Sequence, residues 1–198
     1  MSEYKFDAKG KILGRLATEV AGILMDKNTA SFAPNKMPKN IAVVINTDGI
    51  DIKISGLIGK KVILVDFWTY SCINCQRTTP YLNAWYEKYK DKGFVIVGIH
   101  TPEFEFEKDY NNVKTAVEKF GIKFPVVLDN DYSTWNAYRN HYWPRKYLID
   151  IDGYIVYDHI GEGRYEETER RIQELLAERM LVLGENGNIN QSLTKEII

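Results

Sequence analysis

The two cysteines of the chain, Cys72 and Cys75, lie three residues apart directly after an apolar run at positions 62–68. A helical pattern follows them, which predicts that the first cysteine stands where a helix begins. Backbone N–H groups and the dipole at a helix N-terminus favour a thiolate, and such sites lower a cysteine pKa from about 8.5 to roughly 3.5–7.5. We therefore expect Cys72 to be the exposed nucleophile of a redox pair and Cys75, one turn further on, its resolving thiol.

Two other interpretations of the cysteines stay open from the residues alone, a zinc half-site and a pair of unreactive core thiols. Zinc would need two more ligands, and His100, His141 and His159 are isolated from one another in sequence, so no metal site is expected. Thr69 stands three residues before Cys72, which matches half of the Thr-x-x-Cys pattern of peroxidatic cysteines, but the proline that normally precedes it is absent. Dithiol chemistry is therefore favoured over a peroxidase.

Length and composition indicate an ordinary globular protein: 198 residues, 44% hydrophobic, with a formal net charge of −1. So small a net charge argues against a general attraction to nucleic acid or anionic lipid. No apolar run approaches the roughly 18 residues of a membrane span, and the first residues lack the apolar stretch of a secretory signal. We expect a cytoplasmic protein without membrane contact, where a Cys-x-x-Cys pair is more often catalytic than a permanent bridge.

The elements that position the cysteines follow from hydrophobic periodicity. Strands are expected at 62–68, 94–100 and 126–129, and helices at 74–90 and 113–120. A hairpin with strands at 147–149 and 155–159 turns at an Asp-Gly pair, and a charged amphipathic helix follows at about 165–180. Strands alternating with helices, ending in an antiparallel hairpin, predict an α/β fold with a mixed central sheet and helices on both faces.

The first part of the chain has a different character, and we place a boundary near residue 56. A strand at 4–7, a helix at about 13–27 and strands at 41–45 and 51–54 are expected before it. The chain then divides into residues 1–56, 57–180 and a Gly/Asn-rich tail at 181–198. A strand-helix-strand unit as small as the first must bury its helix face against the second unit or another copy of the chain.

The stretch from Val65 to Cys75, with Pro80 after it, resembles thioredoxin-like proteins of the TlpA type, and most of all the redoxin domains of DipZ-type thiol-disulfide interchange proteins. The likeness continues through 98–104, 129–138, 142–144 and 147–150, and covers about 59–178. It implies a thioredoxin-like fold and exchange of disulfides with protein substrates through a mixed disulfide. The disulfide between Cys72 and Cys75 would be the redox group, with no further cofactor.

The resemblance also implies roles for single residues. Cys72 corresponds to the attacking cysteine, Cys75 to the resolving one, and Asp66 to a buried acid that shuttles a proton to the resolving thiol; from the residues alone, Asp66 is either that shuttle or a structural acid. Pro144 corresponds to a cis-proline facing the dithiol, preceded by Trp143, which would pair with substrate backbone. The other candidates for substrate contact stand before or between the cysteines: Trp68, Tyr70, Ile73 and Asn74.

The residues between the two cysteines differ from those of thioredoxin. Ile73 and Asn74 stand between the cysteines where thioredoxin has Gly-Pro, so the reduction potential, the direction of electron flow and the electron donor or acceptor are open. Glutamate and phenylalanine alternate along 103–107, which indicates either a substrate-facing lip near the dithiol or a solvated strand face.

A second resemblance covers residues 1–55. The stretch from Phe6 to Ala21, followed by 43–48, resembles the start of bacterial large-subunit ribosomal protein thirteen. It implies a truncated segment of that family fused to the redoxin domain. Ribosome or ribosomal RNA binding is then the alternative function, with Lys9, Lys11 and Arg15 either contacting phosphate or lying on a solvated surface.

Overall fold

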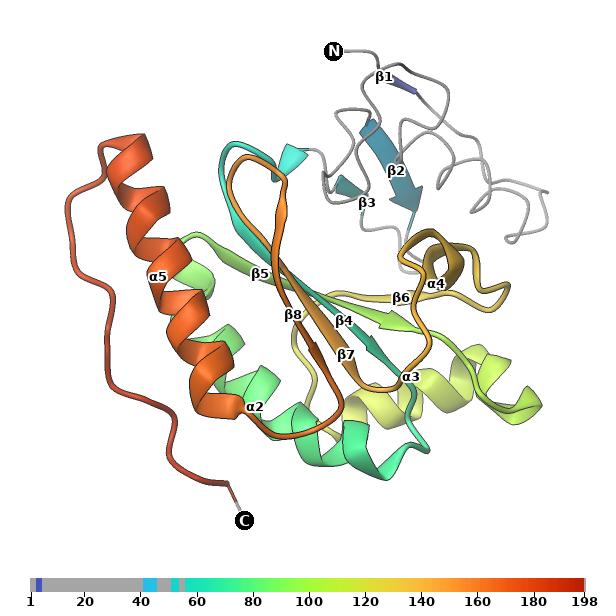
Figure 1. The fold of residues 1–198 in the computed structure, drawn as a ribbon. Helices are drawn as coiled ribbons and strands as arrows, with labels where there is room; N and C mark the ends of the chain where they lie inside the picture. Colours follow the sequence, from blue (N-terminus) through green and yellow to red (C-terminus); the bar gives the residue numbers. More distant parts are fainter. Residues whose placement is uncertain (1–2, 5–40, 46–50, 54–55, 198) are drawn as a thin grey trace.

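The computed structural model describes residues 3–4, 41–45, 51–53 and 56–197 (Figure 1). In the last of these ranges, five strands form one sheet in the order β6-β5-β4-β7-β8. The central strand β4 pairs in parallel with β5 and antiparallel with β7, so the sheet is mixed, as predicted. The strands are β4 (Val62–Trp68), β5 (Phe94–His100), β6 (Val126–Leu128), β7 (Arg145–Ile149) and β8 (Ile155–Ile160).

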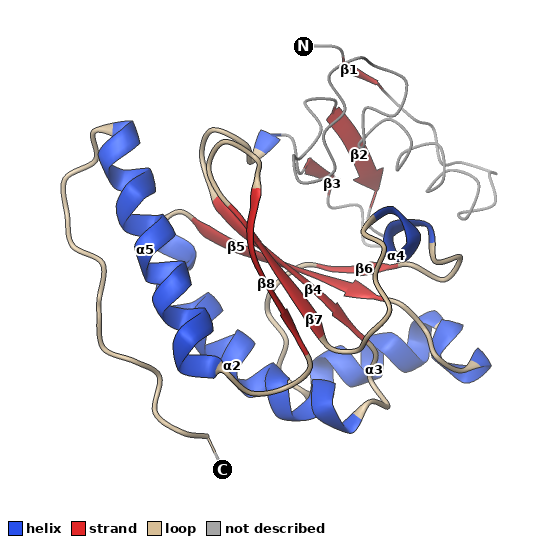
Figure 2. Cartoon of the chain, viewed as in Figure 1, coloured by secondary structure: helices blue, strands red, loops and turns tan. Residues whose placement is uncertain are grey.

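Helices cover both faces of this sheet (Figure 2). Residues of α2 and α5 share one hydrophobic cluster with Val62 and Leu64 of β4, and α3 adds Val117 to it. On the opposite face, Phe67 packs in a second cluster with Trp135 of α4. The helices are α2 (Ile73–Tyr89), α3 (Tyr110–Lys119), α4 (Ser133–Ala137) and α5 (Tyr165–Leu183), with short 3₁₀ turns η2 (Lys90–Lys92) and η3 (Glu105–Lys108).

Burial of β4 on both faces is what holds the cysteine-bearing turn in place. All seven residues of the strand are buried, which explains why its sequence is a nearly continuous apolar run instead of an alternating one. The neighbouring strand carries Gly98, where a Cβ atom would come within 3.0 Å of the Trp68 indole nitrogen and 3.2 Å of Phe124. A larger residue there would require one of the two aromatic rings to shift by a few tenths of an ångström.

Most elements expected after residue 56 are confirmed within a few residues of their predicted ends. The five-residue helix α4 and the turn η3 were not predicted, because neither is long enough to show a helical period. Before residue 56, β2 (Ile41–Ile45) has its predicted bounds and pairs with β1 (Glu3–Tyr4) and β3 (Asp51–Lys53). The helix expected at 13–27 lies outside the described residues.

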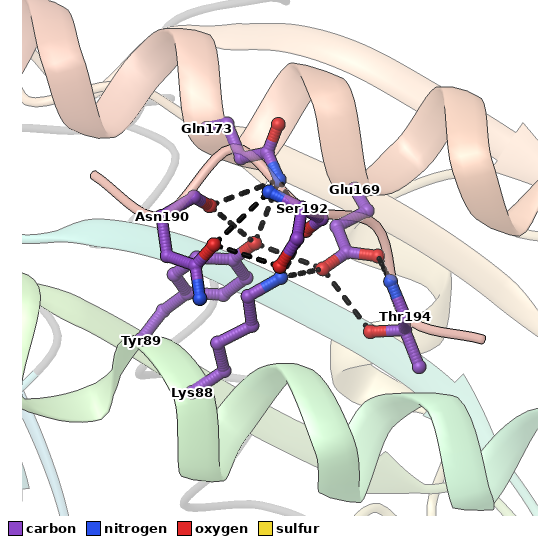
Figure 3. A network of polar contacts seen from close by, with 7 residues as sticks. All are labelled: Lys88, Tyr89, Glu169, Gln173, Asn190, Ser192 and Thr194. Atoms are coloured by element: carbon purple, nitrogen blue, oxygen red, sulfur yellow. Dashed lines mark hydrogen bonds and ion pairs between the residues drawn. The ribbon is translucent and has the colours of Figure 1, made fainter.

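The C-terminal tail binds back along the helices that cover the sheet (Figure 3). The buried carboxylate of Glu169 on α5 accepts hydrogen bonds from Lys88 Nζ at 2.8 Å, the Tyr89 hydroxyl at 2.8 Å and the Thr194 backbone N–H at 2.6 Å. Ile189 of the same tail is only 7% exposed and joins the larger hydrophobic cluster. The tail is therefore part of the folded domain, a feature that its Gly/Asn-rich composition did not predict.

Replacing Ile189 by alanine tests this packing. The substitution removes a buried side chain from the core, so we expect the free energy of unfolding to fall by about 2 to 4 kcal/mol. Urea denaturation followed by circular dichroism measures the change. Leu181→Ala is the matched control, because Leu181 is 83% exposed and its loss is expected to change stability by less than about 0.5 kcal/mol. Equal effects of the two substitutions would contradict a packed tail.

Candidate active site

The dithiol lies in the turn that joins the end of β4 to the start of α2. Cys72 is the N-cap residue of α2 with extended backbone, and its Sγ accepts a hydrogen bond from the Cys75 backbone N–H at 3.3 Å. The Cys72 side chain is half-buried, whereas Cys75 is 2% exposed, and both thiols are free. The predicted position of the first cysteine at a helix entrance is confirmed.

The surroundings of the two thiols move their pKa values in opposite directions. The pKa of Cys72 is lowered from 9.0 to about 7, mainly by a hydrogen bond from the Cys75 thiol, with partial burial opposing and the backbone N–H groups of Cys75 and Asn74 adding to the effect. Burial raises the pKa of Cys75 far above its ordinary range, and its bond to Cys72 raises it further. Near neutral pH, Cys72 is therefore about half ionised and Cys75 holds its proton.

A buried acid and a buried base stand beneath the dithiol on adjacent strands. Asp66 of β4 and Lys146 of β7 face each other in the antiparallel register, and both are almost fully buried. Burial raises the pKa of Asp66 from 3.8 to about 7, while the charge of Lys146 holds it down and that of Cys72 raises it. Burial lowers the pKa of Lys146, with Asp66 and Cys75 opposing. The Asp66 charge also raises the pKa of Cys75, so the acid and the resolving thiol interact electrostatically.

The hydrogen bonds of this pair leave one acceptor free. Lys146 Nζ donates to the Gly161 carbonyl at 3.1 Å, whereas Asp66 Oδ1 has no hydrogen-bond partner in the described part of the chain. A buried carboxyl with a pKa near 7 and an unoccupied oxygen is suited to accept and return a proton. Lys146 was not predicted as a site residue, because only the pairing of β4 with β7 brings it opposite Asp66.

The loop before β7, which carries Trp143 and Pro144, lies beside the dithiol turn. The Trp143–Pro144 peptide bond is cis, as the resemblance implied. Arg145 pairs with Phe67, so Pro144 lies next to the end of β4, where the dithiol turn begins. The Pro144 carbonyl accepts a hydrogen bond from the Gly161 N–H at 2.8 Å, which ties this loop to the residue that also holds Lys146.

Asp129 positions the loop that carries Trp143, a role that was not predicted for it. Its buried carboxylate accepts hydrogen bonds from the Trp135 N–H at 2.9 Å and the Thr101 hydroxyl at 3.1 Å. The Thr101 carbonyl in turn accepts a bond from the Trp143 indole at 3.0 Å, and the Trp143 ring packs on Trp135 at 4.1 Å between centroids. Asp129 thus fixes both partners of the tryptophan that precedes the cis-proline.

The predicted substrate-contact residues differ in their access to solvent. Ile73 is 56% exposed in the first turn of α2, Asn74 beside it is half-buried, and the Tyr70 hydroxyl donates to the Phe106 carbonyl at 3.1 Å. For Trp68 the structure contradicts the prediction. Its side chain is 3% exposed and lies in the core against His100, so a substrate in solvent does not reach it.

The described residues meet neither the requirements of a metal site nor those of a membrane-spanning helix. Among them, no three His, Cys, Asp or Glu side chains are placed to hold a metal ion. His100 is buried behind the dithiol turn, and burial lowers its pKa to about 4. In the same part of the chain, no helix combines the length and the apolar character needed to span a bilayer.

Comparison with known proteins agrees with this geometry. The redoxin family model matches residues 32–176. The DipZ protein of Mycobacterium tuberculosis is 49% identical over 141 residues, which are 70% of this chain and 20% of DipZ. The thiol-disulfide oxidoreductase ResA of Bacillus thuringiensis is 35% identical over 133 residues, 67% of this chain and 73% of ResA. The chain thus spans only about a fifth of the length of DipZ.

Solved structures show the same fold. The thioredoxin domain of a thiol-disulfide oxidoreductase from Bacteroides vulgatus matches with a TM-score of 0.56 and 28% identity, over 72% of this chain and 99% of that one. A thiol:disulfide interchange protein of the thioredoxin family from Chlorobium tepidum matches with a TM-score of 0.61 and 23% identity, over 74% and 99% of the two chains.

The fold and the dithiol at a helix entrance are those of the thioredoxin-like class of proteins. The chain belongs to the redoxin family. The family match begins at residue 32 and so includes residues 32–55, which the second resemblance had placed in a ribosomal-protein-like segment. None of the relatives named above is a ribosomal protein, and a division of the chain at residue 56 stays a prediction.

The hydrogen bond from the Cys75 thiol can be tested by comparing Cys75→Ala with Cys75→Ser. Alanine removes the largest cause of the lowered pKa of Cys72, so we expect this pKa to rise from about 7 towards its ordinary value of 9.0. Serine keeps an O–H donor and is expected to preserve most of the shift. The rate of Cys72 alkylation by iodoacetamide between pH 5 and 10 measures both. Identical profiles for the two variants would contradict this origin of the shift.

Proposed function

We propose that this chain exchanges disulfides with protein thiols through Cys72 and Cys75, by way of a mixed disulfide. The observation that carries the proposal is that the two cysteines at one helix entrance differ in burial and have their pKa values shifted in opposite directions. Cys72 is half-exposed with a pKa near 7, and Cys75 is buried and protonated behind it. The DipZ and ResA relatives support the same chemistry.

The reaction starts at the ionised sulfur. Cys72 Sγ attacks one sulfur of a substrate disulfide, the substrate S–S bond breaks, and the leaving sulfur takes up a proton from solvent. Cys75 then gives its proton to the Asp66 carboxylate and attacks Cys72 Sγ. The mixed disulfide breaks, and the second substrate sulfur leaves as a thiolate that takes up a proton from solvent. Two electrons have then passed from the dithiol to the substrate, and the reverse reaction uses the same groups.

Asp66 and Lys146 make the second step feasible at neutral pH. If burial acted alone, the pKa of Asp66 would be too high for it to be ionised and accept the Cys75 proton. The positive charge of Lys146 lowers this pKa. We assign Asp66 the part of proton acceptor and Lys146 that of a positioning charge. Trp143 and Pro144 are proposed to meet substrate backbone, with Tyr70, Ile73 and Asn74 at the rim of the dithiol.

Removal of the attacking sulfur tests the proposal directly. Cys72→Ser is expected to abolish reduction of insulin disulfides with dithiothreitol as electron donor, because no other described thiol is exposed. Cys75→Ser keeps the nucleophile but lacks the resolving thiol, so it is expected to accumulate mixed disulfides that mass spectrometry detects. Turnover retained by Cys72→Ser would show that another group carries the reaction.

The buried pair can be tested by the pH dependence of the resolving step. This step is expected to speed up as Asp66 ionises near pH 7. Lys146→Met removes the charge that holds the Asp66 pKa down, so the midpoint of the rate-against-pH curve should move to higher pH. Asp66→Asn should abolish this pH dependence and slow the resolving step by about a hundredfold. Release of glutathione from a preformed Cys72–glutathione disulfide measures the rate. Unchanged midpoints in Lys146→Met would contradict the assigned role.

A stability measurement separates this effect from misfolding. The pKa of Asp66 in the folded protein lies above its ordinary value of 3.8, so its stabilising contribution is complete below about pH 4 and is lost as the pH rises through about 7. Asparagine cannot ionise. The free energy of unfolding of Asp66→Asn, relative to the unmodified protein, is therefore expected to increase between pH 4 and 7 and to level off above.

The other expectations gain no comparable support. The residues expected to contact ribosomal RNA lie outside the described part of the chain, and no described feature favours that alternative. The cytoplasmic location stays a prediction.

A further inference from the structure

A loop beside the dithiol, residues 103–109, is tied to the residue that precedes Cys72. The Glu107 carboxylate is fully buried, and its Oε1 accepts hydrogen bonds from the Ser71 N–H at 3.3 Å and the Ser71 hydroxyl at 2.5 Å. Its Oε2 accepts from the backbone N–H groups of Glu103 at 2.6 Å and Phe104 at 2.9 Å. A single side chain therefore fixes the start of this loop against the active-site turn.

Further bonds hold the rest of the loop. The Phe106 carbonyl accepts from the Tyr70 hydroxyl at 3.1 Å and from Asn112 Nδ2 at 3.0 Å. Asp109 caps α3 by accepting from the Asn111 N–H at 2.8 Å. The region is thus a 3₁₀ turn held by hydrogen bonds to Ser71, Tyr70 and Asn112. The sequence interpretation of it as a solvated strand face is wrong.

This rigid turn presents two phenylalanine rings to solvent. Phe104 is 50% exposed and Phe106 53% exposed, and their rings are stacked with centroids 5.5 Å apart and planes 6° from parallel. Exposed aromatic rings on a fixed loop are typical of contact surfaces, because they bury a large area at a small loss of conformational entropy. Ile73, next to Cys72, adds a third exposed apolar side chain, at 56%.

The charge around the rings is negative. Glu103, Glu105 and Asp109 are exposed, and Lys108, the cation within 103–109, pairs with Glu105 at 2.6 Å. The Glu103 charge reaches the nucleophile, since it opposes the lowering of the Cys72 pKa. A cationic side chain placed here would meet carboxylates and aromatic faces together, and both attract it.

We propose that Phe104 and Phe106 form a docking platform for protein substrates whose reacting cysteine is flanked by basic and apolar residues. The proposal rests on the proposed function and narrows it to a substrate class. Apolar side chains of the substrate cover the rings, and its Lys or Arg side chains face Glu103 and Glu105. Glu107 is a positioning residue that keeps the platform beside Cys72.

The experiment compares reduced protein with two peptides, each closed by the same internal disulfide. One carries Arg and Leu beside its first cysteine, and the other carries Glu and Ser. Bis(2-hydroxyethyl) disulfide, which is small and neutral, serves as the reference oxidant. Oxidation of the dithiol is followed by stopped-flow tryptophan fluorescence, and the result is the ratio of each peptide rate constant to the reference rate constant.

We expect the basic peptide to react about tenfold faster than the acidic one, with the difference reduced by 0.5 M salt. Phe104→Ser with Phe106→Ser should lower the basic-peptide ratio about tenfold. Glu103→Gln with Glu105→Gln should lower the preference for the basic peptide about threefold. The control, Leu181→Ser with Val182→Ser, removes two exposed apolar side chains at the far end of α5 and should leave the ratio unchanged.

Three outcomes would overturn the docking platform: equal rates for the two peptides, a ratio insensitive to both platform variants, or a platform double variant that converts a dimer to a monomer in sedimentation without changing the ratio. The last would assign the rings to contact with a second copy. Failure of the reference oxidant and of both peptides to oxidise the unmodified dithiol would instead contradict the proposed function itself, so the two failures are distinguishable.

Discussion

One helix entrance, in which the thiol and the backbone N–H of Cys75 both donate hydrogen bonds to Cys72 Sγ, connects the fold of this protein to its chemistry. It forms because β4 is buried on both faces, which fixes where the strand ends, and because α2 begins one residue after Cys72. The same geometry places Cys75 one turn deeper, in the core. A single structural feature thus leaves one sulfur accessible and partly ionised and the other protected and protonated.

Burial is the common cause of the other pKa shifts in the site. An environment from which water is excluded disfavours the charged form of every group, so it raises the pKa of Cys75 and Asp66 and lowers that of Lys146. Opposite charges on adjacent strands offset part of this cost. The result is an acid whose pKa lies near neutrality, which neither burial nor the lysine would produce alone.

The sequence was informative where the signal is local. The run at 62–68, the spacing of the cysteines and the hairpin turn specify their own conformations, and they led to the sheet and the helix entrance. Lys146 was missed as a partner of the site because its role depends on strand register. Glu107 was expected on a lip or a solvated strand face, and its burial against Ser71 depends on a 3₁₀ turn that brings distant residues together. Trp68 was misjudged because a strand buried on both faces has no alternation that distinguishes core from rim.

The acidic loop couples substrate choice to the reactivity of the nucleophile. Glu103 slightly opposes the ionisation of Cys72, so a cationic substrate side chain that neutralises Glu103 also removes this opposition. By linkage, this coupling is reciprocal: docking of a basic segment favours the Cys72 thiolate by the same free energy by which the thiolate favours docking. A platform that is acidic, aromatic and fixed to the active-site turn by Glu107 therefore selects a substrate and activates the sulfur with the same charges.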